Sequence, residues 1–340
     1  MRTLRFTLVA VACLTALSTL AVAQPGKISK FTNLGSLGGD DGNTFPTAVN
    51  DSGQVVGYSN VVVSGNNVPH AFLYAKGKMT DLGSFFGPAA SSFARGVNNH
   101  GDIAGFYVAG SVTHSFLYSN GKMTDLGTLG GAAATSYAFG VNNHGDVVGW
   151  SDDAAGYTHA FLYSKGKMKD LGSLTGSAGF SYAYGVNDHG DVVGTSYIAG
   201  DTVYHAFLYS NGKMKDLGTL ATSGYDSTAW AVNNHGEVVG YSIMPDGYYH
   251  AFVYSSGKMM DLGTLGGGGS MAYSVNDHGE IVGWADTENG EQHAFLYFNG
   301  QMKDLGPKWQ FGEANGVNNH GQIAGYSILN GQPYSFLYSP

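Results

Sequence analysis

Residues 205–220 read HAFLYSNGKMKDLGTL, and the aromatic phrase at the start of this stretch occurs seven times along the chain. The copies are HAFLY at 70, HSFLY at 114, HAFLY at 159 and 205, HAFVY at 250, HAFLY at 293 and YSFLY at 334. In copies such as the one at 114, the dipeptide Asn120-Gly121 separates the phrase from a second apolar segment. An Asn-Gly pair between two such segments predicts a β-hairpin with a two-residue type I′ turn.

A second phrase, V-N-[ND]-x-G-[DEQ]-[VI]-[VA]-G, precedes each aromatic phrase. Its copies are spaced 42 to 48 residues apart and begin at Val49, Val97, Val141, Val186, Val232, Val275 and Val317. Each repeat holds four short apolar segments, as in SYAFGVN, DVVGWS, HAFLY and KMTDLG, which we name strands a to d. Four strands in about 45 residues is the period of a β-propeller blade. The 53 glycines fit short strands joined by tight turns.

The last repeat ends with YSFLYSP at residues 334–340 and lacks strand d. At the other end of the chain, KFTNLGSLGG (30–39) matches KMTDLGTLGG (122–131) position for position. The sequence therefore predicts an all-β fold over residues 30–340, a single seven-bladed β-propeller of four-stranded antiparallel blades. In this fold the N-terminal strand completes the C-terminal blade, which leaves the ring without an open edge.

Residues 1–23 have the features of a secretory signal peptide: Arg2 and Arg5, then an apolar run, then Ala21-Val22-Ala23. We expect cleavage after Ala23, with residues 24–29 as a short N-terminal segment of a secreted or periplasmic protein. The single cysteine lies within the signal, so no disulfide framework is expected. The chain carries 25 acidic and 16 basic residues, a net charge of −9, which disfavours nucleic-acid partners. No other stretch has the ~20 apolar residues that membrane insertion requires.

The repeated His-Ala-Phe phrase resembles the HAF-type probable extracellular repeat family. The resemblance covers essentially the whole chain after residue 23 and rests on seven copies of the phrase. It implies export and a repeated architecture, and it supplies no catalytic residues to transfer to this chain.

The 12 histidines occupy two positions of the repeat. One set lies in the a–b turn, where Ser52 takes the place of histidine in one copy: His100, His144, His189, His235, His278 and His320. A zinc site needs three or four ligands around one ion, whereas neighbouring turns lie a blade apart. We therefore interpret this set as solvated turn residues, and we expect no metal and no cofactor.

The second set opens strand c. If Tyr118 pairs with Met123 and Phe116 with Asp125, His114 lies opposite Gly127 and diagonal to Asp125. The same spacing gives six His–Asp pairs: His70 and Asp81, His114 and Asp125, His159 and Asp170, His205 and Asp216, His250 and Asp261, His293 and Asp304. In the blade formed by the chain ends the pair becomes Tyr334 and Asn33, which predicts a neutral hydrogen-bonded pair. Six near-identical copies favour a structural latch over a catalytic relay or a metal site.

The a–b and c–d turns are alike in every repeat, whereas the b–c and d–a connections differ and share the opposite face of the ring. This variable-loop face is the expected binding face. If strand a is innermost, the position two before the valine forms either the wall of a central pocket or a blade-to-blade contact: Thr47, Arg95, Phe139, Tyr184, Trp230, Tyr273 and Asn315. The candidate ligand-binding residues are Arg95, Phe139, Tyr184, Trp230, Tyr273, and, in the variable loops, Asp153, Tyr157, Asp246, Tyr249 and Trp309.

These features favour an exported, non-enzymatic binding scaffold, monomeric, that engages an extracellular glycan or protein. The alternative is a hydrolase or lyase of extracellular polysaccharide with its site in the central funnel, for which paired carboxylates would be the signature. A third interpretation is a calcium- or zinc-dependent adhesin, although the chain has no Asp-x-Asp-x-Asp-Gly loop.

Overall fold

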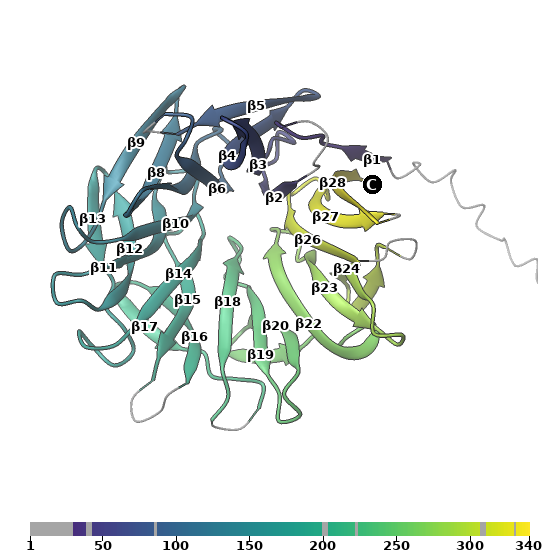
Figure 1. Ribbon diagram of the computed structural model, residues 1–340. Coiled ribbons are helices and arrows are strands. Elements are labelled where there is room, and N and C mark those ends of the chain that lie inside the picture. The colour runs from purple at the N-terminus through teal and green to yellow at the C-terminus, as the bar shows by residue number, and fades with distance from the viewer. Residues whose placement is uncertain are drawn as a thin grey trace, which may run out of the picture.

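The computed structural model describes residues 30–38, 43–84, 87–198, 203–221, 224–306, 311–329 and 331–340. All regular elements in this part of the chain are β-strands, and they form seven four-stranded antiparallel sheets arranged as a ring (Figure 1). The predicted seven-bladed β-propeller is therefore confirmed. No helix in the described residues is long and apolar enough to cross a membrane.

The strands follow the predicted order a to d in each blade. Blade one contains β2 (Thr44–Val49), β3 (Val55–Val63), β4 (Asn66–Ala75) and β5 (Lys78–Gly83). Blade two contains β6 (Ser91–Val97), β7 (Ile103–Ala109), β8 (Val112–Ser119) and β9 (Lys122–Gly127). Blade three contains β10 (Ser136–Val141), β11 (Val147–Asp152), β12 (Thr158–Ser164) and β13 (Lys167–Asp170). Blade four contains β14 (Ser181–Val186), β15 (Val192–Tyr197), β16 (Tyr204–Ser210) and β17 (Lys213–Asp216). Blade five contains β18 (Ser227–Val232), β19 (Val238–Ile243), β20 (Tyr249–Ser255) and β21 (Lys258–Asp261). Blade six contains β22 (Gly266–Val275), β23 (Ile281–Thr287), β24 (Gln292–Phe298) and β25 (Gln301–Asp304).

The seventh blade joins the two ends of the chain. It is built from β26 (Phe311–Val317), β27 (Ile323–Leu329), β28 (Gln332–Ser339) and β1 (Lys30–Asn33), and β1 is its outer strand. The register pairs Phe31 with Tyr338 and Asn33 with Phe336. Figure 1 shows β1 beside β28, close to the C-terminus. The predicted closure is confirmed, and the N-terminal strand completes the blade that the last repeat leaves short.

The hairpin turns have the predicted geometry. Asn120 and Gly121 have φ angles of 52° and 78°, the left-handed values that a type I′ turn requires at both central positions. Tyr118 pairs with Met123 and Phe116 with Asp125, as predicted. The prediction that His114 lies opposite Gly127 is wrong, because a register shift between Ser115 and Phe116 places Ser115 opposite Gly127 instead.

Strand a carries one irregularity that recurs in all seven blades. In blade three, Ala138 pairs with Gly149 and Gly140 pairs with Val148, so Phe139 between them has no partner across the ladder. Such a β-bulge bends the strand and re-aims the side chain of the extra residue. The residues skipped in this way are Thr47, Arg95, Phe139, Tyr184, Trp230, Tyr273 and Asn315.

The hydrophobic cores lie between neighbouring blades. One cluster joins Val148 and Ala160 of blade three to Ala183, Val192 and Phe207 of blade four, all of them fully buried. The phenylalanine of the aromatic phrase is 0% exposed in every blade, which accounts for its presence in all seven copies.

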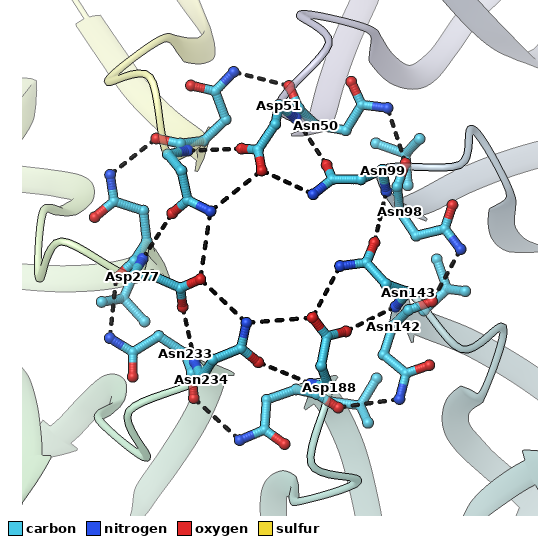
Figure 2. A pocket seen from close by; sticks show the side chains of 18 of the residues that line it. Asn50, Asp51, Asn98, Asn99, Asn142, Asn143, Asp188, Asn233, Asn234 and Asp277 are labelled. Atoms are coloured by element: carbon cyan, nitrogen blue, oxygen red, sulfur yellow. Dashed lines mark hydrogen bonds between the residues drawn. The ribbon is translucent and has the colours of Figure 1, made fainter.

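The a–b turns close the ring at one end of the axis (Figure 2). The asparagine after each strand a donates its side-chain N–H to the backbone oxygen of the same asparagine in the next blade, at 2.8–3.1 Å: Asn50, Asn98, Asn142, Asn187, Asn233, Asn276 and, returning to Asn50, Asn318. The following residues form a second belt, in which each backbone N–H donates to the next side-chain oxygen at 2.8–2.9 Å: Asp51, Asn99, Asn143, Asp188, Asn234, Asp277 and Asn319. We refer to these two belts as the asparagine ring.

Candidate functional site

The axis of the ring opens into a cavity at the end opposite the asparagine ring. The cavity has a volume of about 410 Å³, within the range of ~300–1,000 Å³ typical of small-molecule sites. Its lining residues are Phe45, Pro46, Thr47, Tyr58, Arg95, Phe139, Tyr184, Trp230, Tyr273, Glu313 and Asn315. Besides the seven bulge residues, it is lined by Phe45, Pro46 and Glu313, which precede the bulge in their strand a, on the side where the d–a connections enter. The cavity therefore opens on the variable-loop face, and we call it the axial cavity.

The bulges in strand a build this cavity. All seven bulge residues line it, one from each blade, because the missing ladder partner turns each side chain towards the axis. The structure thus brings together five of the candidate residues: Arg95, Phe139, Tyr184, Trp230 and Tyr273. The two interpretations left open by the sequence are both realised, since these side chains line a pocket and also contact one another across blades.

Aromatic rings form a continuous wall over blades three to six. The ring centroids of Phe139 and Tyr184 are 5.2 Å apart, those of Tyr184 and Trp230 are 4.3 Å apart, and those of Trp230 and Tyr273 are 6.2 Å apart. The indole N–H of Trp230 is buried and has no hydrogen-bond partner among the described residues. Burial raises the pKa of Tyr273 to about 12, so its hydroxyl stays protonated and can donate to a ligand.

Arg95 lies beside this wall with aromatic rings around its guanidinium. The guanidinium carbon is 5.7 Å from the ring centroid of Tyr58, 5.4 Å from that of Phe106 and 5.8 Å from that of Phe139. Contacts of this kind stabilise a cation by roughly 0.5–2 kcal/mol each. Burial nevertheless lowers the pKa of Arg95, because the desolvation of its charge outweighs the other influences.

Glu313 is the carboxyl group of the cavity. It stands in β26 where the other blades carry Phe45, Phe93, Tyr137 or another uncharged residue. Burial raises the pKa of Glu313, and a weak 3.5 Å hydrogen bond from the side-chain amide of Asn315 opposes this effect. Its protonated form can donate a hydrogen bond and its ionised form can accept one.

The candidate residues in the b–c loops lie outside the axial cavity. Asp153 accepts hydrogen bonds from the backbone N–H groups of Ala155 and Tyr157 at 2.8 and 2.9 Å, and Asp246 accepts one from Tyr248 at 3.1 Å. These carboxylates hold the turns of their own loops. Their neighbours Tyr157 and Tyr249 pack against other aromatic rings, Phe180 and Tyr241 respectively. Trp309 lies outside the described residues.

The sequence pattern did not single out Tyr58, Phe45 or Glu313. Tyr58 belongs to strand b, which was expected to lie behind strand a, and it lines the cavity together with Phe45, its partner across the ladder. The signal for Glu313 was present in the sequence. Glu313 is the acidic residue at a repeat position that is aromatic or uncharged in the other blades. In the same way, Arg95 is the basic residue at the bulge position, two residues further along strand a.

The six His–Asp pairs lie at the outer part of the blades, away from the axial cavity. In each pair the Nδ1 atom of the histidine lies 2.8–3.0 Å from a carboxylate oxygen of the aspartate. In His70 and His159 the other ring nitrogen lies 3.0 and 3.1 Å from a carbonyl oxygen of the following d–a connection. The pairs therefore link strands c and d, and two of them also hold the loop that leads to the next blade.

Each aspartate of a pair also accepts a hydrogen bond from a backbone N–H at the end of strand d, such as that of Gly127 for Asp125. Burial alone would raise the pKa of Asp125 and Asp216, but the bonds from histidine and from the backbone hold it below the usual range.

The predicted bond between Tyr334 and Asn33 is not formed in the described part of the chain. Asn33 instead accepts from Gly35 N–H at 2.9 Å, and Tyr334 packs against an apolar cluster.

The histidines of the a–b turns lie at hairpin tips, where His100 and His144 are exposed. Among the described residues, no group of three or more His, Cys, Asp or Glu side chains is arranged to hold a metal ion.

No family model matches the chain, and no curated protein matches it. The resemblance to the HAF-type repeat family therefore stays a prediction. Solved structures with a similar fold include a puromycin-hydrolyzing peptidase of Mycobacterium tuberculosis, with a TM-score of 0.60 and 11% identity over 88% of this chain. The match covers 51% of that peptidase, so the chain spans about half its length.

Two other solved structures match over nearly their whole length. The β-propeller domain of the Trilobed protease from Pyrococcus furiosus has a TM-score of 0.57 and 10% identity, and the match covers 87% of this chain and 95% of the domain. An oligogalacturonate lyase in complex with manganese has a TM-score of 0.53 and 12% identity, over 92% of this chain and 93% of the lyase. At these identities the likeness concerns the β-propeller fold.

Proposed function

We propose that this protein is an exported, non-enzymatic binding scaffold that engages an extracellular glycan or protein through its variable-loop face, with the axial cavity as the site. The observation that carries the proposal is the lining of the cavity. Seven equivalent bulges present seven largely different side chains on a rigid wall, while the opposite end of the axis is lined by near-identical turns. A constant scaffold with a varied concave surface is the usual division between framework and binding site.

Export is part of the proposal. It is supported by the signal-like segment at residues 1–23 and by the resemblance of the His-Ala-Phe phrases to an extracellular repeat family. The expected mature N-terminus is Gln24, which peptide mapping of the protein recovered from the periplasm or culture medium checks. A full-length chain that stays in the cytoplasm would contradict this part.

A binding screen tests the proposed site. Purified residues 24–340 are applied to glycan and extracellular-protein arrays beside a variant with Arg95→Ala and Trp230→Ala. A saturable hit that the variant loses, at an unchanged melting temperature, supports the axial cavity. Hits that survive in the variant would place the site elsewhere, and a blank for the wild type would count against a binding scaffold.

A polysaccharide hydrolase or lyase is the second candidate, and Glu313 favours it. A carboxyl group with a raised pKa in a concave site is suited to proton transfer. Glycoside hydrolysis ordinarily uses two carboxyl groups, whereas the lining includes one. The test is release of oligosaccharides from extracellular polysaccharides by the wild type and its loss with Glu313→Gln.

A further inference from the structure

Arg95 is a cation without an acidic partner among the residues that the structure describes. In the described part of the chain no carboxylate lies within 4.0 Å of its guanidinium, and its Nε atom is buried without a hydrogen bond. Arginine stays charged even when it is buried, so the desolvation of its guanidinium must be offset by contacts. The three aromatic faces around it offset part of this cost, but they supply no negative charge.

The packing of the ring does not require a cation at this place. The equivalent bulge residues of the other blades are Thr47, Phe139, Tyr184, Trp230, Tyr273 and Asn315. Thr47 donates a hydrogen bond to the backbone oxygen of Ala94 at 3.0 Å, and Asn315 donates one to that of Pro46 at 2.9 Å. Both bonds link neighbouring blades. Arg95 makes no such bond to the described residues, so its guanidinium contacts aromatic rings there and no acceptor.

The groups next to Arg95 in the axial cavity suit a polar ring-shaped ligand. Phe139, Tyr184 and Trp230 offer flat apolar faces, and the indole N–H of Trp230 is a second donor without a partner among the described residues. Glu313 stands in blade seven and Arg95 in blade two, on either side of blade one, which carries Tyr58, and all three line the cavity. Arg95 and Glu313 thus present two different hydrogen-bonding groups to one occupant.

We propose that the axial cavity binds a sugar unit that carries a carboxylate, a uronate residue of an acidic oligosaccharide. The carboxylate lies on the guanidinium of Arg95, the C–H face of the sugar ring lies against the aromatic wall, and its hydroxyl groups meet Glu313 and Asn315. A planar guanidinium matches a carboxylate through two parallel N–H donors. This inference rests on the proposed binding function and names its ligand class.

A peptide C-terminus carries the same carboxylate, but the lining fits it less well. Capture of a peptide end commonly relies on backbone N–H groups arranged as a nest or along a strand edge. The axial cavity instead presents side-chain hydroxyl, amide and carboxyl groups between aromatic rings, which match the many hydroxyl groups of a sugar.

The test is isothermal titration calorimetry of purified residues 24–340 with trimers of galacturonate and of glucuronate. The same trimers with methyl-esterified carboxyl groups are the matched neutral ligands, and a short peptide with a free or an amidated C-terminus is the third arm. We expect the acid trimers of at least one sugar to bind, and the esters to bind about 10- to 100-fold more weakly, as for the loss of a charged hydrogen bond.

Two variants assign the effect to Arg95. Arg95→Met keeps an unbranched side chain without the guanidinium and is expected to lose the same ~10- to 100-fold for the acid while binding the ester as the wild type does. Lys122→Met removes an exposed lysine at the start of β9 and should change neither affinity. Melting temperatures show that each variant is folded. The comparison of acid with ester on the wild type does not depend on the variants.

Each other outcome overturns the inference. Equal binding of acid and ester would show that no carboxylate is recognised and would leave glycan binding standing. Binding of the free peptide end without the trimers would reject the sugar class. Binding of no ligand in any arm would reject the uronate and count against the binding function as well.

Discussion

At the scale of single residues, the repeated polar groups bind the backbone. His159 is 1% exposed, and its ring nitrogens lie 2.8 Å from Asp170 and 3.1 Å from the buried carbonyl oxygen of Gly179. Asn98 is 4% exposed and its side-chain oxygen accepts from the N–H groups of His100 and Asp102, at 3.0 and 2.8 Å. These residues satisfy backbone groups that a tight turn would otherwise leave without partners.

A prediction at this scale concerns the two sets of histidines. His159→Ala leaves the Gly179 carbonyl without its partner, so we expect a loss of about 1–3 kcal/mol in the free energy of unfolding. His144→Ala, at an exposed turn tip of the same blade, should change it by less than about 0.5 kcal/mol. Urea denaturation of the two variants measures the difference, and equal losses would contradict the structural role of the latch.

At the scale of the strand, the bulge in strand a depends on the glycine it faces in strand b. Gly149 pairs with Ala138, and a Cβ atom on Gly149 would overlap the carbonyl oxygen of Tyr137. The same overlap with the preceding strand a is present for Gly194 and Gly240, so the glycine of the V-V-G phrase is set by close approach of two backbones. The repeated glycine therefore holds the geometry that turns the bulge residues towards the axis.

We expect Gly149→Ala to destabilise the fold by at least about 3 kcal/mol, because backbone atoms rather than a flexible side chain must move. The control is Gly166→Ala in the β12–β13 turn, where a Cβ meets nothing within 4 Å and only the φ of 79° opposes alanine. That control should cost about 1–2 kcal/mol. Thermal unfolding of both variants compares them; a smaller loss for Gly149→Ala would refute the account of the bulge.

At the scale of the whole molecule, two sets of contacts keep the ring closed, one at its outside and one at its axis. The strand β1 closes the seventh blade at the outside, and the asparagine ring joins all seven blades at the axis. Each of Asp51, Asp188 and Asp277 accepts amide N–H bonds from both neighbouring blades, so three negative charges are held by amide donors. Separation of any two blades breaks bonds in both belts.

Acid is expected to loosen the asparagine ring. Burial alone would raise the pKa of Asp188, but hydrogen bonds from Asn143 and Asn234 hold it below the usual range. A carboxyl whose pKa is lowered by folding stabilises the protein above its unfolded pKa, and this stability is lost as the pH falls through the folded value. The melting temperature should therefore decline below about pH 4. Asp188→Asn should reduce this decline, and an identical decline would remove Asp188 from the explanation.

A disulfide tests the outer closure. Thr32 of β1 and Leu337 of β28 are direct partners, so Thr32→Cys with Leu337→Cys links the two ends of the chain. The expected stabilisation is about 3–5 kcal/mol, since the bond closes almost the whole chain into one loop. The reduced form of the same variant is the control. Equal melting temperatures in the oxidised and reduced forms would show that separation of β1 from β28 does not limit stability.

The sequence by itself determined the number of blades, the order of strands, the turn types and the closing strand. Each of these follows from local signals that occur seven times, such as Asn120-Gly121 and the Val-Asn phrase, so a weak signal in one copy is supported by the other six. The diagonal contact of His114 with Asp125 followed from the hairpin register in the same way.

Only the tertiary structure showed that the varied residues of strand a share one cavity, which from the sequence was one of two alternatives. The bulge at Phe139 is invisible to an alternating pattern, because it depends on the approach of strand b at Gly149. The axial cavity then forms from seven residues that are far apart along the chain and meet only when the ring is closed. For the same reason Asp153 and Asp246, which resemble binding residues in sequence, bond to their own loops, while Glu313 joins Arg95 at the axis.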